Sequence, residues 1–211
     1  MDEYPDLRNA ILTGSAPSAA AAAKKALEGG ADPVAIVEKE VGPAMNEVGR
    51  LYEAGEYFVP ELLLAARATK EVFGILRPLL AKKGAKPVAR VVIGTVQGDL
   101  HDIGKNLVAA MLEGSGFEVI DLGINVSPDK FIAAIREKQP QIVGLSALLT
   151  TTMPAMKTTL DGFRNAGLRD SVKVMIGGAP VTQAYADSIG ADAFGENAAA
   201  AVSVARKLVA C

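Results

Sequence analysis

Short apolar segments alternate with amphipathic segments from about residue 88 onward, and this alternation restricts the possible folds more than any other feature of the chain. Strands are expected at residues 88–95, 117–121, 141–145, 172–176 and 193–194. Helices are expected near residues 103–115, 128–138, 153–166, 181–189 and 198–209. Five consecutive strand–helix units are typical of a doubly wound, Rossmann-like parallel sheet with helices on both faces. The sequence therefore predicts an α/β domain over residues 87–211.

The first part of the chain shows no such strand pattern and is predicted to be helical. Helices are expected at residues 6–12, 18–28, about 32–51 and 60–80. Asp32 followed by Pro33 suits the N-cap and first position of a helix. Residues 82–87, rich in lysine and ending in proline, are typical of an exposed linker. We therefore expect residues 1–86 to form a four-helix bundle with a linker.

Composition and charge exclude several classes of protein. The chain has 211 residues, half of them hydrophobic, which is enough for one large or two small domains. A net charge of −2 argues against a nucleic-acid partner. The single cysteine, Cys211, cannot form a disulfide within the chain, as expected in a reducing compartment. With no apolar run long enough for a membrane span and no signal-peptide pattern, we expect a cytoplasmic protein.

The only histidine in the chain, His101, follows the first predicted strand. Ligands in open α/β sheets bind at the carboxyl ends of the strands, so this position favours a binding role. A surface or helix-capping histidine is the alternative. Ser146 and Thr150 follow the third strand, and Gly177-Gly178 follow the fourth, although ordinary strand–helix turns use the same residue types. The glycines near the first strand match neither a P-loop nor a dinucleotide fingerprint.

Three segments in this order resemble the signature of cobalamin-binding domains. The run Asp99-Leu100-His101-Asp102-Ile103-Gly104 is similar to Asp-x-His-x-x-Gly, and Ser146-Ala147-Leu148 and Gly177-Gly178 are similar to the two elements that follow it. Residues 55–66 resemble the helical domain that accompanies this module. From about Val34 to the end, the chain resembles the small corrinoid carrier proteins of anaerobic methyltransferase systems and the cobalamin-binding module of methionine synthase. The resemblance implies a flavodoxin-like strand order, 2-1-3-4-5.

The resemblance also implies roles for particular residues. His101 would be the lower axial ligand of cobalt, and Asp99 would hydrogen-bond the second nitrogen of its ring. Phe58 would belong to an apolar cap over the upper face of the corrin. The remaining cofactor contacts would be Gly98, Leu100, Asp102, Gly104, Ser146, Leu148, Thr150, Gly177, Gly178 and Ala198. For Asp102 a helix N-cap is the alternative, and for Gly104 the alternative is tight packing of helix on sheet.

The function implied by the resemblance is methyl transport on a cobalt-containing corrinoid, which is cobalamin or a variant with another lower base. A substrate-specific methyltransferase would supply the methyl group from a methylamine, methanol, a betaine or an aryl methyl ether. A second methyltransferase would pass it to tetrahydrofolate or coenzyme M, and a reductive activator would be a further partner. No catalytic residue is expected in the chain itself. The alternatives are a subunit of an adenosylcobalamin-dependent mutase and a cobalamin-based sensor; the helical region favours the carrier.

Overall fold

A computed structural model describes residues 4–210, so Cys211 lies outside the described part. The chain divides into two compact units. The first unit contains residues 1–87 together with residues 110–116, and the second contains residues 88–109 and 117–211. Within residues 4–210, no helix combines the length and hydrophobicity required to cross a membrane.

The first unit is helical, as predicted. Its elements are α1 (Pro5–Leu12), α2 (Ala16–Glu28), α3 (Pro33–Ile36), η1 (Val37–Val41), α4 (Gly42–Glu53) and α5 (Val59–Lys82). Helix α2 packs on α5, and α1 packs on both α2 and α4. Ala19, Ala23 and Ala26 are buried, so the alanine-rich segment forms an ordinary packed helix.

The helix expected from Asp32 to about Leu51 is interrupted by a π-helical turn, η1, which the sequence analysis did not predict. Pro43 follows this turn and has no backbone N–H, so it cannot donate to the carbonyl of Lys39 four residues earlier. Arg8 supplies the missing donor, with Nη2 2.7 Å from the Lys39 carbonyl oxygen. The interruption therefore follows from the proline and is compensated from α1.

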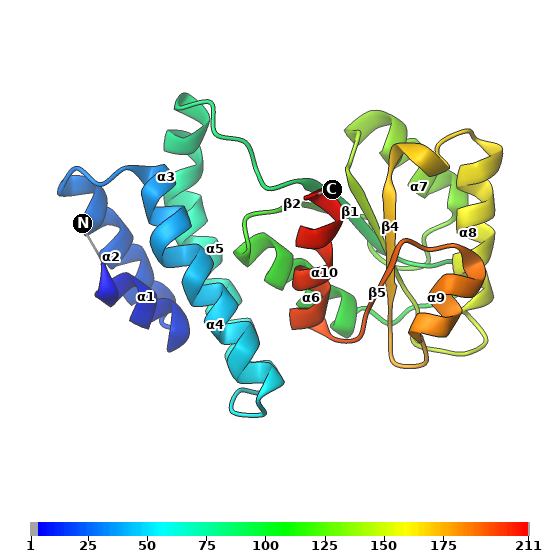
Figure 1. The fold of residues 1–211 in the computed structure, drawn as a ribbon, viewed down its shortest axis with the longest axis horizontal. Helices are drawn as coiled ribbons and strands as arrows, with labels where there is room; N and C mark the ends of the chain where they lie inside the picture. Colours follow the sequence, from blue (N-terminus) through cyan, green and yellow to red (C-terminus); the bar gives the residue numbers. More distant parts are fainter. Residues whose placement is uncertain (1–3, 211) are drawn as a thin grey trace. The chain divides into compact units, whose positions relative to one another are not determined.

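The second unit is a five-stranded parallel sheet with the order β2-β1-β3-β4-β5, which confirms the predicted doubly wound fold (Figure 1). Its strands are β1 (Arg90–Thr95), β2 (Glu118–Asp121), β3 (Ile142–Ser146), β4 (Lys173–Gly177) and β5 (Ala193–Gly195). Its helices are α6 (Ile103–Gly114), α7 (Pro128–Lys138), α8 (Pro154–Asn165), α9 (Gln183–Ile189) and α10 (Ala198–Val209), with a 3-10 turn, η2 (Arg169–Ser171), before β4. Strand and helix boundaries differ from the expected ones by one or two residues.

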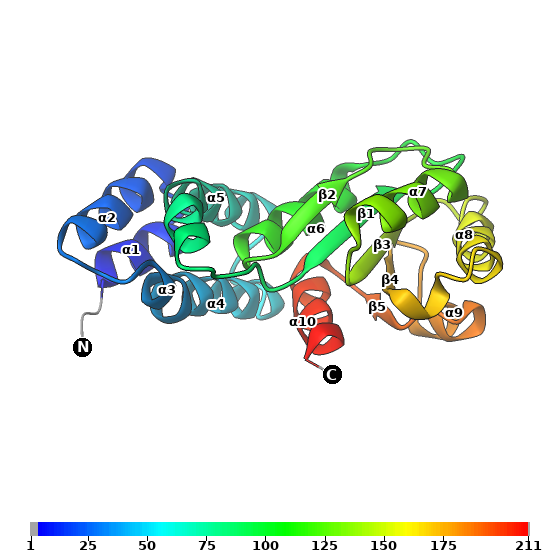
Figure 2. The same cartoon turned by 90° about the horizontal axis from the view of Figure 1, so that it is seen from above.

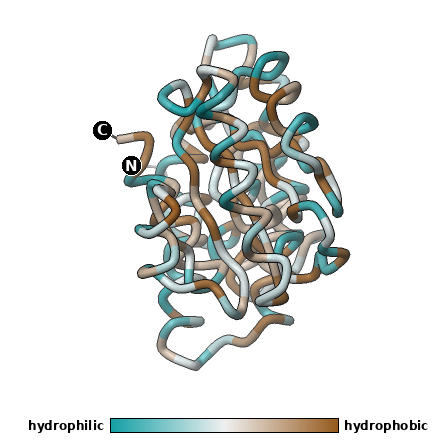
Figure 3. The backbone as a smooth tube through the Cα atoms, turned by 90° about the vertical axis from the view of Figure 1, so that its right-hand side faces the viewer, coloured by the Kyte–Doolittle hydropathy of each residue, from teal (hydrophilic) through white to brown (hydrophobic). Residues whose placement is uncertain are grey.

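Helices cover both faces of this sheet. In Figure 2, α7, α8 and α9 lie on one face, and α6 and α10 lie on the other. Val92, Val143 and Val174 contribute to a core that also contains Phe131 and Phe163, whose rings meet edge to face with centroids 6.4 Å apart. Hydrophobic stretches of chain accordingly run through the interior in Figure 3, and hydrophilic stretches lie mainly at the outer turns.

Candidate functional site

The sheet register aligns the carboxyl ends of four strands. Thr95 pairs with Ser146, Ser146 with Gly177, and Gly177 with Gly195. The loops that follow these residues therefore leave from one edge of the sheet, where α/β folds bind ligands. This register brings together the three sequence motifs, which are residues 99–104, 146–148 and 177–178.

Asp99 connects two of these loops. Its side chain is completely buried. Oδ1 accepts a hydrogen bond from the backbone N–H of His101 at 3.0 Å and lies 2.8 Å from Nδ1 of the same residue. Oδ2 accepts from the backbone N–H of Leu148 at 2.8 Å and from the hydroxyl of Thr152 at 2.6 Å. One carboxylate thus holds the loop after β1 against the loop after β3.

The environment keeps Asp99 ionised. Burial alone would raise the pKa of this carboxyl, but the hydrogen bonds from Thr152, from the backbone of His101 and Leu148, and from the His101 ring together hold the pKa well below its usual range. An ionised carboxylate only accepts hydrogen bonds, so the proton between the two groups belongs to Nδ1 of His101. Nε2 is then the nitrogen with a lone pair in the neutral ring. The His101 side chain as a whole is 49% exposed.

Thr152 is a site residue that the sequence analysis missed. Thr150 was the threonine predicted to contact the cofactor, and it is exposed. Thr152 is buried, and its hydroxyl donates a hydrogen bond to Asp99. Three consecutive threonines follow Leu149, and only their phase relative to the start of α8 decides which hydroxyl turns inward. A cofactor contact by Thr150 stays a prediction.

Two further residues hold the histidine loop from outside the motifs. The buried hydroxyl of Thr95 donates to the backbone carbonyl of His101 at 2.8 Å. Asn125 Oδ1 accepts from the backbone N–H of Gly98 at 2.8 Å, where Gly98 has a φ of +85°. Neither residue was predicted. The Thr95 contact depends on how the loop after β1 turns back on the strand, and the Asn125 contact joins positions 27 residues apart.

Gly178 has a structural requirement of its own. Its φ is +134°, and an added Cβ would lie 1.8 Å from the carbonyl oxygen of Ala147. A Cβ on Gly177 would come within 3.0 Å of the Gly195 carbonyl oxygen. Close approach of backbone segments therefore accounts for both glycines within the protein.

Gly104 differs from this pair. It lies in the first turn of α6, and an added Cβ would meet no atom within 4 Å. The alternative that this glycine permits tight packing of helix on sheet is therefore wrong. No neighbouring protein atom lies within 4 Å of the position that a Cβ at residue 104 would occupy.

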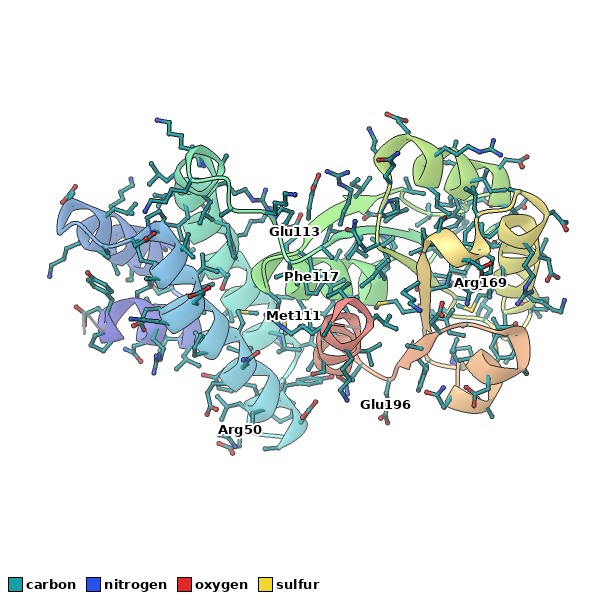
Figure 4. All side chains as sticks on the ribbon, turned by 45° about the horizontal axis from the view of Figure 1, so that its top comes forward. Arg50, Met111, Glu113, Phe117, Arg169 and Glu196 are labelled. Carbon is teal, nitrogen blue, oxygen red and sulfur yellow. The ribbon has the colours of Figure 1, made fainter. Side chains whose placement is uncertain are left out.

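The other predicted residues are placed as follows. Ser146 is partly buried at the end of β3, and among the described residues its hydroxyl has no hydrogen-bond partner. Asp102 accepts a hydrogen bond from the amide of Asn106 at 3.1 Å. Ala198 is the buried first residue of α10. Glu196, which was not a predicted site residue, lies just before this helix and extends into solvent (Figure 4). Phe58 belongs to the first unit, at the start of α5, and is 63% exposed.

Comparison with known proteins agrees with this arrangement. A family profile described as a B12 binding domain matches residues 89–205, and a second profile of the same description matches residues 5–77. The chain belongs to the B12-binding corrinoid proteins. Its cofactor is accordingly a cobalt-containing corrinoid.

Relatives of this corrinoid protein match it over almost their full length. The dimethylamine corrinoid protein 1 of Methanosarcina acetivorans is 44% identical, with 97% of this chain and 96% of the relative covered. The trimethylamine corrinoid protein 1 of the same organism is 45% identical, with 90% and 89% covered.

Two solved structures have the same fold. A cobalamin-binding protein from Desulfitobacterium hafniense matches with a TM-score of 0.83 and 33% identity over 99% of each chain. A chain of the methanol:cobalamin methyltransferase complex from Methanosarcina barkeri matches with a TM-score of 0.85 and 31% identity, covering 97% of this chain and 78% of that one.

The surface around His101 in this corrinoid protein fits a large, partly apolar ligand. Leu100 and Ile103 flank the histidine and are 66% and 82% exposed. Leu148 and Leu149 are also exposed, and the backbone of Leu148 is tied to Asp99. Clusters of exposed large aliphatic side chains mark binding surfaces in soluble proteins. Together with the unfilled space at Gly104, this cluster is a candidate contact surface for the corrinoid.

We predict that Gly104→Ala affects cofactor binding and apo-protein stability in opposite directions. The new methyl group has space and removes backbone entropy from the unfolded chain, so the apo protein should gain roughly 0.5–1 kcal/mol. Corrinoid affinity should fall by about tenfold or more, equivalent to about 1.4 kcal/mol, because the methyl group enters the ligand's space. Thermal melting of the apo protein and a cobalamin titration measure the two effects.

Gly74→Ala is the matched control for this variant. Gly74 lies within α5, and an added Cβ there also meets nothing within 4 Å. This control should gain similar stability and bind cobalamin as the wild type does. Unchanged affinity in Gly104→Ala would contradict the prediction.

Proposed function

We propose that this corrinoid protein takes a methyl group from a substrate-specific methyltransferase and delivers it to a second methyltransferase that uses tetrahydrofolate or coenzyme M. The relatives named for dimethylamine and trimethylamine favour a methylamine as the donor. Methanol, betaines and aryl methyl ethers are the other donors to be compared. The match to a chain of a methanol:cobalamin methyltransferase complex supports a methyltransferase as a direct partner. A reductive activator completes the proposed set of partners.

The observation that carries the proposal is the pairing of Asp99 with His101. The 2.8 Å contact of Nδ1 with the carboxylate favours the tautomer in which Nε2 carries the lone pair. We propose that this nitrogen is the lower axial ligand of the cofactor. When bound, the corrinoid supplies a strongly nucleophilic cobalt centre that accepts and releases methyl groups. The protein then contributes one ligand of fixed orientation.

The remaining site residues would hold the cofactor in place. Gly98, Leu100, Asp102 and Gly104 lie on the histidine loop or at the start of α6, and we propose that they contact the corrin ring. Ser146, Leu148 and Thr150 would contact it from the loop after β3. The free hydroxyl of Ser146 is suited to donate a hydrogen bond to a ligand atom.

The nucleotide tail of the corrinoid requires a second region. Gly177, Gly178 and Ala198 are the residues proposed to lie beside it. Their small size removes side-chain bulk from the ends of β4 and β5, where Gly195 and Ala201 are already in close contact.

In the first unit, Phe58, Val59, Leu63 and Leu64 are exposed apolar residues near the start of α5. Four such side chains within seven positions exceed the scattered exposure that a protein surface normally shows. We propose that Phe58 contacts the bound cofactor and shields it from water and oxidants. Such shielding protects a reactive centre from side reactions.

Methyl loading in the presence and absence of a partner tests the proposal. The reduced holoprotein is mixed with each donor class, with and without methyltransferases encoded beside it, and the absorbance change that accompanies methylation is followed. We expect rapid methylation with one matched methyltransferase and its donor, and none with the donor alone. Ether and ammonium methyl groups leave poorly without an activating site, and we propose that the partner methyltransferase supplies it.

Two outcomes would contradict the carrier function. Fast methylation by a natural donor without any partner would indicate a self-contained enzyme. Failure with every such methyltransferase, combined with tight adenosylcobalamin binding, would favour the mutase subunit. A response to light or adenosylcobalamin that changed binding to another macromolecule would favour the sensor.

A further inference from the structure

We propose that Asn125 is a positioning residue that sets the orientation of His101 by clamping the backbone on both sides of Asp99. This inference rests on His101 as the cobalt ligand in the proposed function. Asn125 lies in the loop between β2 and α7, outside the three cofactor motifs. It does not touch the imidazole and would act through Asp99.

The clamp consists of two hydrogen bonds from one residue. Asn125 Oδ1 accepts from the backbone N–H of Gly98 at 2.8 Å, and the backbone N–H of Asn125 donates to the carbonyl of Asp99 at 3.0 Å. Asn125 has a φ of +50°, a left-handed conformation that asparagine tolerates better than most residues do. This conformation allows its side chain and its own N–H to bind the same short segment.

The loop that carries Asn125 is itself fixed to β1. The backbone N–H of Thr95 donates to the Gly123 carbonyl at 3.0 Å, and the N–H of Val126 donates to the Thr95 carbonyl at 2.9 Å. Val126 is completely buried. The residues on either side of Asn125 are therefore anchored to the strand that precedes the histidine loop. Asn125 itself is exposed, and these backbone hydrogen bonds attach its loop to β1.

The effect on His101 follows from the order of contacts. Gly98 has a φ of +85°, which glycine adopts freely, and the backbone N–H of Asp99 closes this turn by donating to the Val96 carbonyl at 3.1 Å. The bonds to Asn125 are a second restraint on the same turn. The clamp restrains this turn, the turn places Asp99, and Asp99 holds the ring at Nδ1. The bonds from Leu148 and Thr152 hold only Oδ2 of Asp99. Without Asn125, we expect Asp99 to stay attached to the β3 loop while its Oδ1 loses a fixed position relative to the imidazole.

Two substitutions of Asn125 separate its side chain from its backbone. Asn125→Gly removes the acceptor for Gly98 but keeps the backbone donor and tolerates positive φ. Asn125→Asp keeps an acceptor oxygen and also tolerates this conformation. Ser127→Ala is the matched control in the same loop, since Ser127 Oγ accepts from the N–H of Lys130 at the start of α7. Its loss weakens that helix cap and leaves the Asn125 contacts intact.

The first measurement uses the apo protein. His101 is the only histidine, so the ring nitrogen signals in a ¹⁵N spectrum belong to this residue alone. With the ring neutral, we expect the Nδ1–H tautomer to predominate in the wild type, in Asn125→Asp and in Ser127→Ala. Asn125→Gly should shift toward the Nε2–H tautomer that free imidazole side chains prefer. This readout needs neither cofactor nor methyl transfer.

The second measurement uses the protein loaded with cob(II)alamin. Removal of a direct hydrogen-bond partner of a metal ligand typically costs 10–100-fold in affinity, and a residue one contact further away should cost less. We expect Asn125→Gly to bind cob(II)alamin roughly 3–10-fold more weakly and to lose part of the nitrogen hyperfine splitting in its electron paramagnetic resonance spectrum. Asn125→Asp should keep the wild-type affinity for cob(II)alamin and the wild-type nitrogen splitting.

The outcomes distinguish this inference from the assignment of the ligand. A wild-type tautomer ratio in Asn125→Gly would overturn the positioning role, as would an equal shift in Ser127→Ala, which would indicate a general effect of loop stability. If the tautomer shifts as expected but wild-type cob(II)alamin shows no nitrogen splitting from the protein, the positioning of His101 stands and the ligand assignment in the proposed function fails.

Discussion

His101→Ala is expected to abolish the nitrogen hyperfine splitting that a protein imidazole gives to cob(II)alamin. The chain has no second histidine that could replace the ligand. Asp99 Oδ1 lies 2.8 Å from Nδ1 of His101 and orients the ring. The substitution therefore removes a preorganised ligand. Loss of a hydrogen-bond partner of a metal ligand typically lowers affinity about 10–100-fold, so loss of the ligand itself should lower cobalamin affinity by at least that factor. Electron paramagnetic resonance and a cobalamin titration measure both effects.

Stability and rescue provide the controls for this variant. The ring is about half exposed and the backbone N–H of His101 still binds Asp99, so the apo protein should keep its fold. Added imidazole should restore the nitrogen splitting by filling the space that the side chain leaves. Persistence of the splitting in His101→Ala without imidazole would show that another group is the ligand.

Asp99→Asn is expected to destabilise the apo protein by roughly 2–4 kcal/mol. The carboxylate accepts from two backbone N–H groups, the Thr152 hydroxyl and the His101 ring while fully buried. An asparagine has one acceptor oxygen, and its NH₂ group would face donors on the other side. At least one buried donor then loses its partner. Urea unfolding of the cofactor-free protein measures the change.

The dependence on pH provides an independent check on Asp99. Its pKa is lower in the folded protein than in the unfolded chain, where an aspartate has a pKa of about 3.9. The ionised carboxylate thus contributes stability above that pH, and the contribution is lost as the pH falls toward the folded-state pKa. The stability difference between wild type and Asp99→Asn should therefore narrow below about pH 4.

Two variants calibrate the size of the Asp99 effect. Thr152→Val removes one of the hydrogen bonds and should cost about 1 kcal/mol. Asp161→Asn affects a partly exposed carboxylate of α8 that pairs with Lys157 and Arg164, and it should change stability by less than about 0.5 kcal/mol. A loss below about 0.5 kcal/mol for Asp99→Asn would contradict the view of this carboxylate as the main connection between the two loops.

The elements of the fold were predictable because their signals are local. Strands β1, β3 and β4 are short runs of mainly buried aliphatic residues, whereas β2 and β5 are shorter and only partly buried. All five were located from the sequence. The strand order came from the resemblance, because periodicity does not specify which strands are neighbours. The π-helical turn at Val37–Val41 was missed because it depends jointly on Pro43 and on a donor from Arg8 in another helix.

The site residues also differ in whether their roles have a local signal in the sequence. Asp99 and His101 are two residues apart, so their pairing could be predicted from the motif. Thr152 lies 53 residues from Asp99, and Asn125 lies 27 residues from Gly98. Their roles depend on sheet register and on the phase of α8, which the sequence does not display. Gly104 was identified from the motif, but only the three-dimensional structure shows that its missing side chain faces empty space.

Helix α6 belongs to both units of this protein. It begins two residues after His101, and residues 110–116, which include its last turns, are part of the helical unit. There Lys70 pairs with Glu113 at 2.9 Å, and a Cβ on Gly114 would lie 3.1 Å from Met45 Cε. The chain therefore passes between the units at three points, after residues 87, 109 and 116. Cutting the chain at residue 87 would separate Glu113 and Gly114 from the side chains they contact. We therefore expect a fragment of residues 88–211 to be less stable than the same residues in the whole chain, because residues 110–116 would lack these contacts.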